Sequence, residues 1–294
     1  MSLCTGHPVL NLFCTCSALS FLLMKQQHEQ FPSALEAVFL VAFLMGVEFV
    51  INAGFYDMRS VLGMDPAHMI GIVFLLANAV LFTVLLHYKK MTYSSLFHAS
   101  RTPVMATVTL LGVPVLMLVP ALSLLIMLLE QVLVQWMPVP VAQQKVFDQM
   151  MLSGLSSIVT ACLIAPVVEE MLFRGIILRS FLNQYSRWQA IFASALLFGF
   201  AHLNIYQFFA ALLLGCLCGW LYERSRSLWP GIILHASYNS LAMLVERLAV
   251  SGEDWQPTTA HWLIAIVLLV IGAGLLHKLL RQQALPPLEK PEVK

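Results

Sequence analysis

The sequence predicts an all-α fold, a polytopic transmembrane helical bundle of about eight to nine spans, from three observations. First, 60% of the 294 residues are hydrophobic and 11% are charged, whereas soluble domains have roughly 45–50% apolar and about 25% charged residues. Second, apolar runs of spanning length recur along the chain. Third, basic residues gather in alternate connections. These features exclude a soluble enzyme, a disordered chain and a secreted disulfide scaffold, and a net charge of +1 offers nucleic acid no basic surface.

The expected spans are the runs of mainly apolar residues. They lie near 8–24, 34–55, 67–87, 103–129, 148–168, 188–203, 205–222, 228–248 and 259–280. No Lys or Arg precedes Lys25, so the first run lacks the basic start of a signal peptide and is expected to be retained. The stretch 148–183 is longer than a bilayer core requires. We expect a bend near Pro166, which cannot donate a helical hydrogen bond, and then a cytoplasmic extension that carries Arg179.

The distribution of Lys and Arg orients the bundle. One set of alternate connections carries most of them, namely Lys25, Lys89, Lys90, Arg101, Arg179, Arg187, Arg224, Arg226, Lys278 and Arg281. The opposite connections hold Arg59 alone, Lys145 alone or, at 249–258, acids without a basic residue. Because cytoplasmic loops are enriched in Lys and Arg, we expect the N-terminus outside and the C-terminus in the cytoplasm.

Ionisable residues inside the apolar runs are few, and they usually mark function because they are costly in a bilayer. In the first half of the chain Glu48 lies deepest. It is either a buried partner of an Arg or of a backbone donor, or a functional acid. In the second half, Glu169 and Glu170 follow Pro166 and precede Arg174. Glu170 and Arg174 are expected to pair on one helix face. Glu169 is rotated by about 100°, so it is left as a free acid that can accept or donate a proton.

Two further polar motifs follow on neighbouring runs. His202 ends the sequence Phe-Gly-Phe-Ala-His, and Phe198 lies one turn before it, where it can buttress the imidazole ring. His235 and Asn239 are four residues apart and project from one helix face. Asn239 offers N–H donors that suit a developing oxyanion. Each motif alone is more often structural, but three on neighbouring runs indicate one shared polar site.

One carboxylate, two imidazoles and a carboxamide are suited to hydrolysis, which needs a base for water and donors for a tetrahedral intermediate. Neither Gly-x-Ser-x-Gly nor His-Glu-x-x-His occurs in the sequence, so it shows no nucleophile elbow and no zincin motif. Glu169, His202 and His235 leave a two-His, one-carboxylate zinc site open, although the nearby cation of Arg174 makes it less attractive. We expect no metal or other cofactor, with zinc as the alternative.

The three motifs, in this order and on hydrophobic helices, resemble those of the CPBP family. These are the CAAX-processing and bacteriocin-processing intramembrane proteases, also called the ABI family. The motifs are Glu-Glu-x-x-x-Arg at 169–174, Phe-x-x-x-His at 198–202 and His-x-x-x-Asn at 235–239. The resemblance implies a CAAX-protease-like catalytic core within 148–248. The expected organisation adds variable transmembrane helices at 1–147, a C-terminal transmembrane helix at 249–281 and a disordered cytoplasmic tail at 282–294.

The resemblance also implies roles for the motif residues. The catalytic residues would be Glu169, His202, His235 and Asn239, supported by Glu170, Arg174 and Phe198. In this assignment Glu169 activates water with the help of His202, while His235 and Asn239 hold the oxyanion.

The expected function is that of a glutamic-type endopeptidase, integral to the bacterial inner (plasma) membrane, which hydrolyses a peptide bond of a membrane-associated protein or peptide. The alternative is a non-catalytic scaffold or bacteriocin-immunity-type factor that uses the same cavity for binding. A proton-coupled transporter is less favoured, because the sequence shows no inverted repeat. The sequence leaves open the substrate, any role of prenylation and the oligomeric state.

Overall fold

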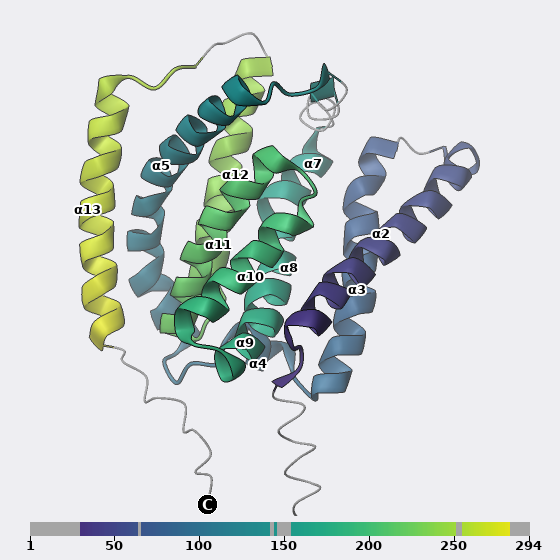
Figure 1. Ribbon diagram of the computed structural model, residues 1–294, viewed down its shortest axis with the longest axis horizontal. Coiled ribbons are helices and arrows are strands. Elements are labelled where there is room, and N and C mark those ends of the chain that lie inside the picture. Colours follow the sequence, from purple (N-terminus) through teal and green to yellow (C-terminus); the bar gives the residue numbers. More distant parts are fainter. Residues whose placement is uncertain (1–29, 64–65, 142–143, 146–153, 251–254, 283–294) are drawn as a thin grey trace, which may run out of the picture.

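The protein is a bundle of helices, shown in Figure 1 as a computed structural model. The structure describes residues 30–63, 66–141, 144–145, 154–250 and 255–282. Within these ranges the chain forms helices and no strand, and one isolated bridge joins His98 to Ser227. The predicted all-α class is therefore confirmed. The expected first span, 8–24, and the tail beyond Gln282 lie outside the described residues.

Among the residues that the structure describes, five helices are long and apolar enough to cross a membrane. Their spanning segments are Ala34–Arg59, Met69–Lys89, Val104–Trp136, Ile205–Ser225 and Thr259–Arg281. The chain is therefore an integral membrane protein, and the count of eight to nine spans stays a prediction.

Helices α2 (Ala34–Leu62) and α3 (Pro66–Lys89) form an antiparallel pair at one side of the bundle (Figure 1). A capping box starts α2, because the Ser33 side chain accepts a hydrogen bond from the Glu36 N–H and Glu36 Oε2 accepts one from the Ser33 N–H at 2.7 Å. Such reciprocal bonds satisfy two N–H groups that a helix start leaves free. Glu36 is thereby a structural residue, whereas Glu48 lies near the middle of α2.

One continuous helical run carries Pro166 and both adjacent acids. It consists of α7 (Leu155–Val159), η1 (Thr160–Ile164), α8 (Ala165–Glu170), η2 (Met171–Leu178) and α9 (Arg179–Gln184). The segments η1 and η2 are π-helical. The wide turn of η1 lies directly before Pro166, where it accommodates the proline ring. The chain therefore continues as a helix through Pro166, and the run is roughly 45 Å long at 1.5 Å per residue.

Helix α10 (Arg187–Ala201) is shorter than the expected span at 188–203 suggests. Its 15 residues extend about 22 Å, less than the roughly 30 Å of a bilayer core. The chain then turns at Leu203, with φ of 49°, and enters α11 (Ile205–Ser225). Because α10 does not cross the bilayer alone, His202 at its end can share a site with residues from within other helices.

Helices α5 (Val104–Trp136), α11, α12 (Trp229–Val250) and α13 (Thr259–Gln282) complete the bundle. Figure 1 shows α13 alongside α5 at the edge opposite α2 and α3. Glycines allow α11 to pack closely on α10. A Cβ atom at Gly215 would lie 3.0 Å from Cβ of Ala195, and one at Gly219 would lie 3.1 Å from Cγ2 of Ile191. This contact places α11 directly behind the polar motifs.

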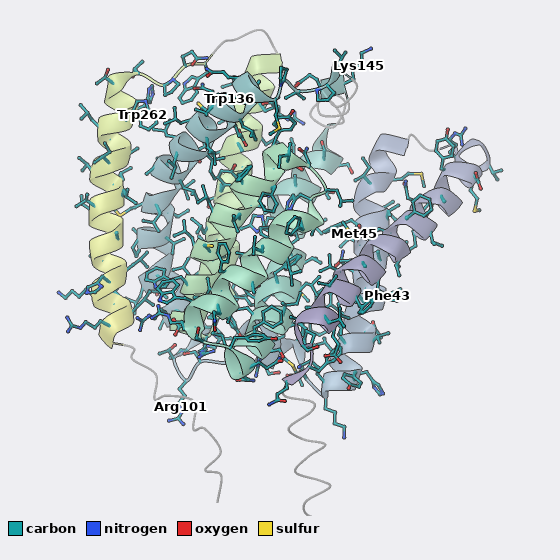
Figure 2. The ribbon with its side chains drawn as sticks, in the orientation of Figure 1. Phe43, Met45, Arg101, Trp136, Lys145 and Trp262 are labelled. Atoms are coloured by element: carbon teal, nitrogen blue, oxygen red, sulfur yellow. The ribbon has the colours of Figure 1, made fainter. Side chains whose placement is uncertain are left out.

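The connections rich in Lys and Arg lie together at one end of the bundle. The connection from α3 to α5 contains the short helix α4 (Tyr93–Phe97), and its Ala99 N–H donates to the Arg226 carbonyl between α11 and α12 at 2.9 Å. Figure 2 shows Arg101 at this end and Lys145 at the opposite end. The alternation seen in the sequence is thus present in space, and the assignment of the basic end to the cytoplasm stays a prediction.

Candidate active site

A buried ion pair anchors the region that follows α8. Arg174 Nη1 donates to Glu170 Oε1 at 2.8 Å, and each side chain is 1% exposed. The other terminal nitrogen, Nη2, donates to the Gly215 carbonyl on α11 at 2.9 Å. The guanidinium carbon lies 4.7 Å from the centroid of the Phe198 ring on α10, a cation–π contact. The expected pair of Glu170 and Arg174 is present, and it links the long helical run to α10 and α11.

His235 of α12 lies between the two adjacent acids. Its Nδ1 is 3.2 Å from Glu170 Oε1, and its Nε2 is 3.6 Å from Glu169 Oε2. Because Glu170 is the ionised partner of Arg174, its carboxylate accepts and His235 Nδ1 donates. His235 Nε2 is then directed toward Glu169. The Glu169 side chain is 22% exposed, so Glu169 is the accessible acid and Glu170 is the enclosed one.

Phe198 contacts the rings of both histidines. The centroid of its ring lies 5.0 Å from that of His202 and 5.6 Å from that of His235, edge to face in both cases. His202 Nδ1 is 2.9 Å from the Phe198 carbonyl oxygen. A carbonyl oxygen can only accept, so Nδ1 donates and Nε2 is the ring nitrogen left free to accept a proton. The expected buttress of His202 by Phe198 is present, and its contact with His235 is additional.

Asn239 lies one turn after His235 and is held by the backbone of η1. Its Nδ2 donates to the Ala161 carbonyl at 2.9 Å. That carbonyl lacks a regular helical donor, because the Ala165 N–H bonds to Thr160 instead and Pro166 has no N–H. Pro166 and the π turn thus create the acceptor that orients Asn239. One N–H of the Asn239 amide is used in this way, and the other is free for a ligand.

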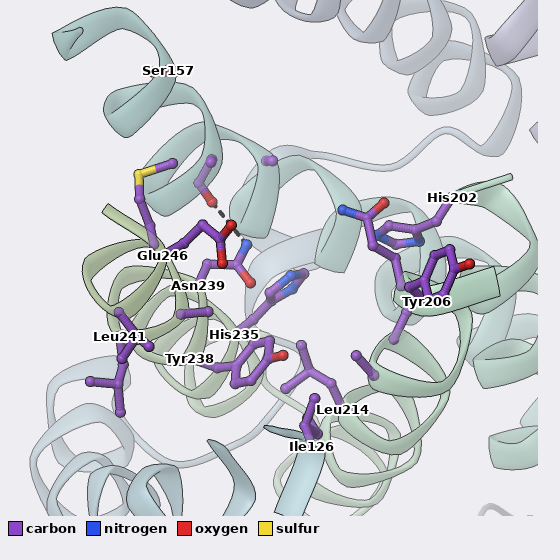
Figure 3. A pocket seen from close by; sticks show the side chains of 18 of the residues that line it. Ile126, Ser157, His202, Tyr206, Leu214, His235, Tyr238, Asn239, Leu241 and Glu246 are labelled. Atoms are coloured by element: carbon purple, nitrogen blue, oxygen red, sulfur yellow. Dashed lines mark hydrogen bonds between the residues drawn. The ribbon is translucent and has the colours of Figure 1, made fainter. Parts of the chain in front are cut away.

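The candidate catalytic groups share one cavity of about 640 Å³, which we call the large cavity. Its lining includes Glu169, His202, His235 and Asn239. Other polar residues of the lining include Glu130, Tyr206, Gln207, Tyr238 and Glu246. Figure 3 shows His202 on one side of the cavity and His235 with Asn239 on the other. Of the supporting residues, Phe198 also lines the cavity, whereas Glu170 and Arg174 do not. Glu170 reaches the site through its contact with His235.

Sequence reasoning missed two contributors to the site because neither offers a reactive side chain. The first is the backbone carbonyl of Ala161. The second is Gly231 of α12, where a Cβ atom would lie 2.8 Å from Glu170 Oε2. Gly231 precedes His235 by four residues, so it occupies the same helix face. A glycine four residues before His235 was the one feature of the sequence that could have indicated a close approach of α12 to another group.

Gly231→Ala is expected to destabilise the protein by about 1–3 kcal/mol, the usual cost of overpacking. The added methyl group would meet a carboxylate that Arg174 and His235 hold in place, so Glu170 cannot move aside. The measurement is the thermal unfolding midpoint in detergent. Gly274→Ala is the matched control, since no atom lies within 4 Å of its Cβ position. Equal midpoints for the two variants would contradict the close approach.

The fold and the site define a membrane-embedded helical protein with a polar cavity between its helices. Residues 150–241, which include all three motifs, match the family described as "Type II CAAX prenyl endopeptidase Rce1-like". A relative named "Putative membrane peptidase YdiL", from Bacillus subtilis (strain 168), is 24% identical over 107 residues. The alignment covers 36% of this chain and 44% of the relative's length. No solved structure matches the chain. The two matches support the resemblance of the segment 150–241 to the CPBP family.

Proposed function

We propose that the protein is an integral-membrane endopeptidase of glutamic type that hydrolyses a peptide bond of a membrane-associated protein or peptide. The observation that carries the proposal is the convergence of Glu169, His202, His235 and Asn239 on one cavity. Each of these side chains has a defined neighbour that orients it. The family match and the peptidase name of the relative support this function over the non-catalytic alternative.

The proposed reaction is direct attack of water on the substrate carbonyl. The oxygen of the water bonds to the carbonyl carbon while Glu169 takes a proton from this water. His202 Nε2 accepts a hydrogen bond from the same water and so orients it. The free N–H of Asn239 and the Nε2–H of a doubly protonated His235, whose Nδ1–H stays bonded to Glu170, stabilise the oxyanion. When the intermediate collapses, the C–N bond breaks and the leaving nitrogen takes the proton from Glu169. Glu169 is then a carboxylate again.

The surroundings of the cavity suit a hydrophobic substrate. The cavity lies among helices that cross the bilayer, and most of its lining residues are apolar. A peptide can enter this cavity only from the bilayer or from its surface. We therefore propose a membrane-associated substrate. The basic end of the bundle would face the cytoplasm of a bacterial inner membrane, with the C-terminus on that side.

The test of the proposed function is cleavage by the purified protein in lipid vesicles. The vesicles contain a library of membrane-anchored peptides, and mass spectrometry identifies any new termini. The proposal predicts cleavage of a subset of peptides with a common sequence pattern. No cleavage of any peptide, by protein shown to be folded, would count against an endopeptidase.

Cleavage is expected to continue when the protein is treated with a strong zinc chelator. Within the described ranges, no group of three His, Cys, Asp or Glu side chains is arranged to hold a metal ion. His235 is directed at Glu169, the base of the proposed mechanism, and at Glu170, the partner of Arg174. The measurement is the cleavage rate after chelation, with elemental analysis of the treated protein. Loss of the rate on chelation and its return with added zinc would establish the zinc alternative.

A further inference from the structure

A second, smaller cavity also borders Glu169 and His202. It has a volume of about 110 Å³ and lies among α2, α3, α8, η2 and α10. Its polar lining residues are Glu48, Asn78, Glu169 and His202, and the remaining lining residues are apolar. We call this space the small chamber. Two of its four polar residues therefore belong to the candidate active site, and the other two come from helices outside the segment 150–241 that matches the family.

Asn78 brings an unsatisfied acceptor to the small chamber. The residue is 3% exposed, and its Nδ2 donates to the Phe74 carbonyl one turn earlier at 2.9 Å. Its Oδ1 is buried and receives no hydrogen bond from the described residues. Buried polar atoms without a protein partner are commonly satisfied by an ordered water. Asn78 thus indicates a water as the occupant of this space.

Glu48 is the second polar residue that the proposed reaction has not used. It lies within the apolar spanning segment Ala34–Arg59 of α2, where an ionisable group is costly and is usually directed to the protein interior for function. No hydrogen bond or ion pair joins its carboxyl group to another described residue. Water in the small chamber would give this group the hydrogen bonds that it otherwise lacks.

We propose that the small chamber holds the water that Glu169 and His202 activate, and that Glu48 and Asn78 are positioning residues that order this water. The volume admits on the order of three waters at about 30 Å³ each, and a buried water needs two to four polar partners. A peptide bound in the large cavity would exclude bulk water from it. Glu169 lines both cavities. Water held in the small chamber, on the side of α2 and α3, could therefore reach Glu169 while a peptide fills the large cavity.

The direct test is a crystal structure of the whole protein at a resolution that shows ordered waters. We expect a water within hydrogen-bonding distance of Asn78 Oδ1, connected to Glu169, in the wild-type protein. Asn78→Leu, which removes the polar acceptor at similar size, should lose that water while the helices keep their positions. A dry chamber in the wild-type protein would overturn the proposal. This measurement needs no substrate, so its result is independent of the proposed peptidase function on which the inference rests.

The kinetic test compares Glu48→Gln with Asp57→Asn, an acid-to-amide change on the same helix at an exposed position outside both cavities. We expect Glu48→Gln to lower kcat about 10- to 100-fold with KM unchanged, because the water is displaced and substrate contacts are kept. Asp57→Asn should retain the wild-type kcat. Equal kcat values for the two variants, or a change in KM alone, would overturn the role of Glu48. If the wild-type protein cleaves no substrate, the proposed function fails. The crystal structure alone then tests whether the small chamber holds an ordered water.

Discussion

Glu169→Gln is expected to abolish peptide hydrolysis while the protein stays folded in the membrane. Glutamine has nearly the same shape as glutamate but cannot take the proton of the attacking water. General-base catalysis contributes about 10²- to 10⁴-fold, so kcat should fall by at least that range. The fold should tolerate the change, since Glu169 is partly exposed and His235 keeps its bond to Glu170. The measurement is kcat in lipid vesicles, accompanied by the thermal unfolding midpoint.

The matched control for Glu169→Gln is Glu223→Gln. Glu223 lies on α11, pairs with Arg187 at 3.0 Å and lines neither cavity. The control separates the loss of a particular acid from the general loss of one negative charge. Wild-type kcat in Glu223→Gln and none in Glu169→Gln is the expected pair of results. A fully active Glu169→Gln protein would remove Glu169 from the reaction.

Arg174→Met is expected to destabilise the protein more strongly than Gly231→Ala. Methionine fills much of the space of the arginine stem, but it leaves the Glu170 carboxylate enclosed without its cation. Removing one partner of a buried pair costs about 3–5 kcal/mol. The bond to Gly215 and the contact with Phe198 are lost as well. We expect a protein that accumulates poorly in the membrane and unfolds at low temperature in detergent.

Two comparisons test whether the enclosed charge is the cause. Arg187→Met breaks a pair whose side chains are 30% and 16% exposed, and surface pairs contribute about 0–1 kcal/mol. The double variant Glu170→Gln with Arg174→Met removes both charges and should recover part of the stability, because no unpaired ion remains. If Arg174→Met destabilises no more than Arg187→Met, the buried pair does not support the site.

Features that depend on composition and short spacing could be predicted from the sequence. The scarcity of charge indicated membrane helices, and the i, i+4 spacing of Glu170 with Arg174 predicted their contact. The same reasoning placed His235 and Asn239 on one helix face, where both line the large cavity. These inferences succeed because helical geometry fixes which residues of one helix are neighbours.

Features that depend on contacts between distant helices were not predictable. No pattern in the sequence indicated that α10 is too short to cross the bilayer. This short length lets His202, at the end of α10, line the same cavity as Glu169 and His235. The role of Glu48 stayed open between a structural and a functional acid. Only the packing of α2 against α10 and of α3 against α7 shows that Glu48 and Glu169 line one cavity. The partner of Asn239 is a backbone carbonyl in a π turn, and side-chain patterns carry no signal for such an atom.

The role of Glu169 in hydrolysis can be tested in cells by comparing the termini of membrane proteins in two otherwise identical populations. One population carries the wild-type protein as its only copy, and the other carries Glu169→Gln at the same level. We expect at least one protein or peptide with a new terminus in the wild-type membranes, present only as the uncut precursor in the variant membranes. Identical termini in both populations would contradict the proposal that Glu169 activates water for hydrolysis of a membrane-associated substrate.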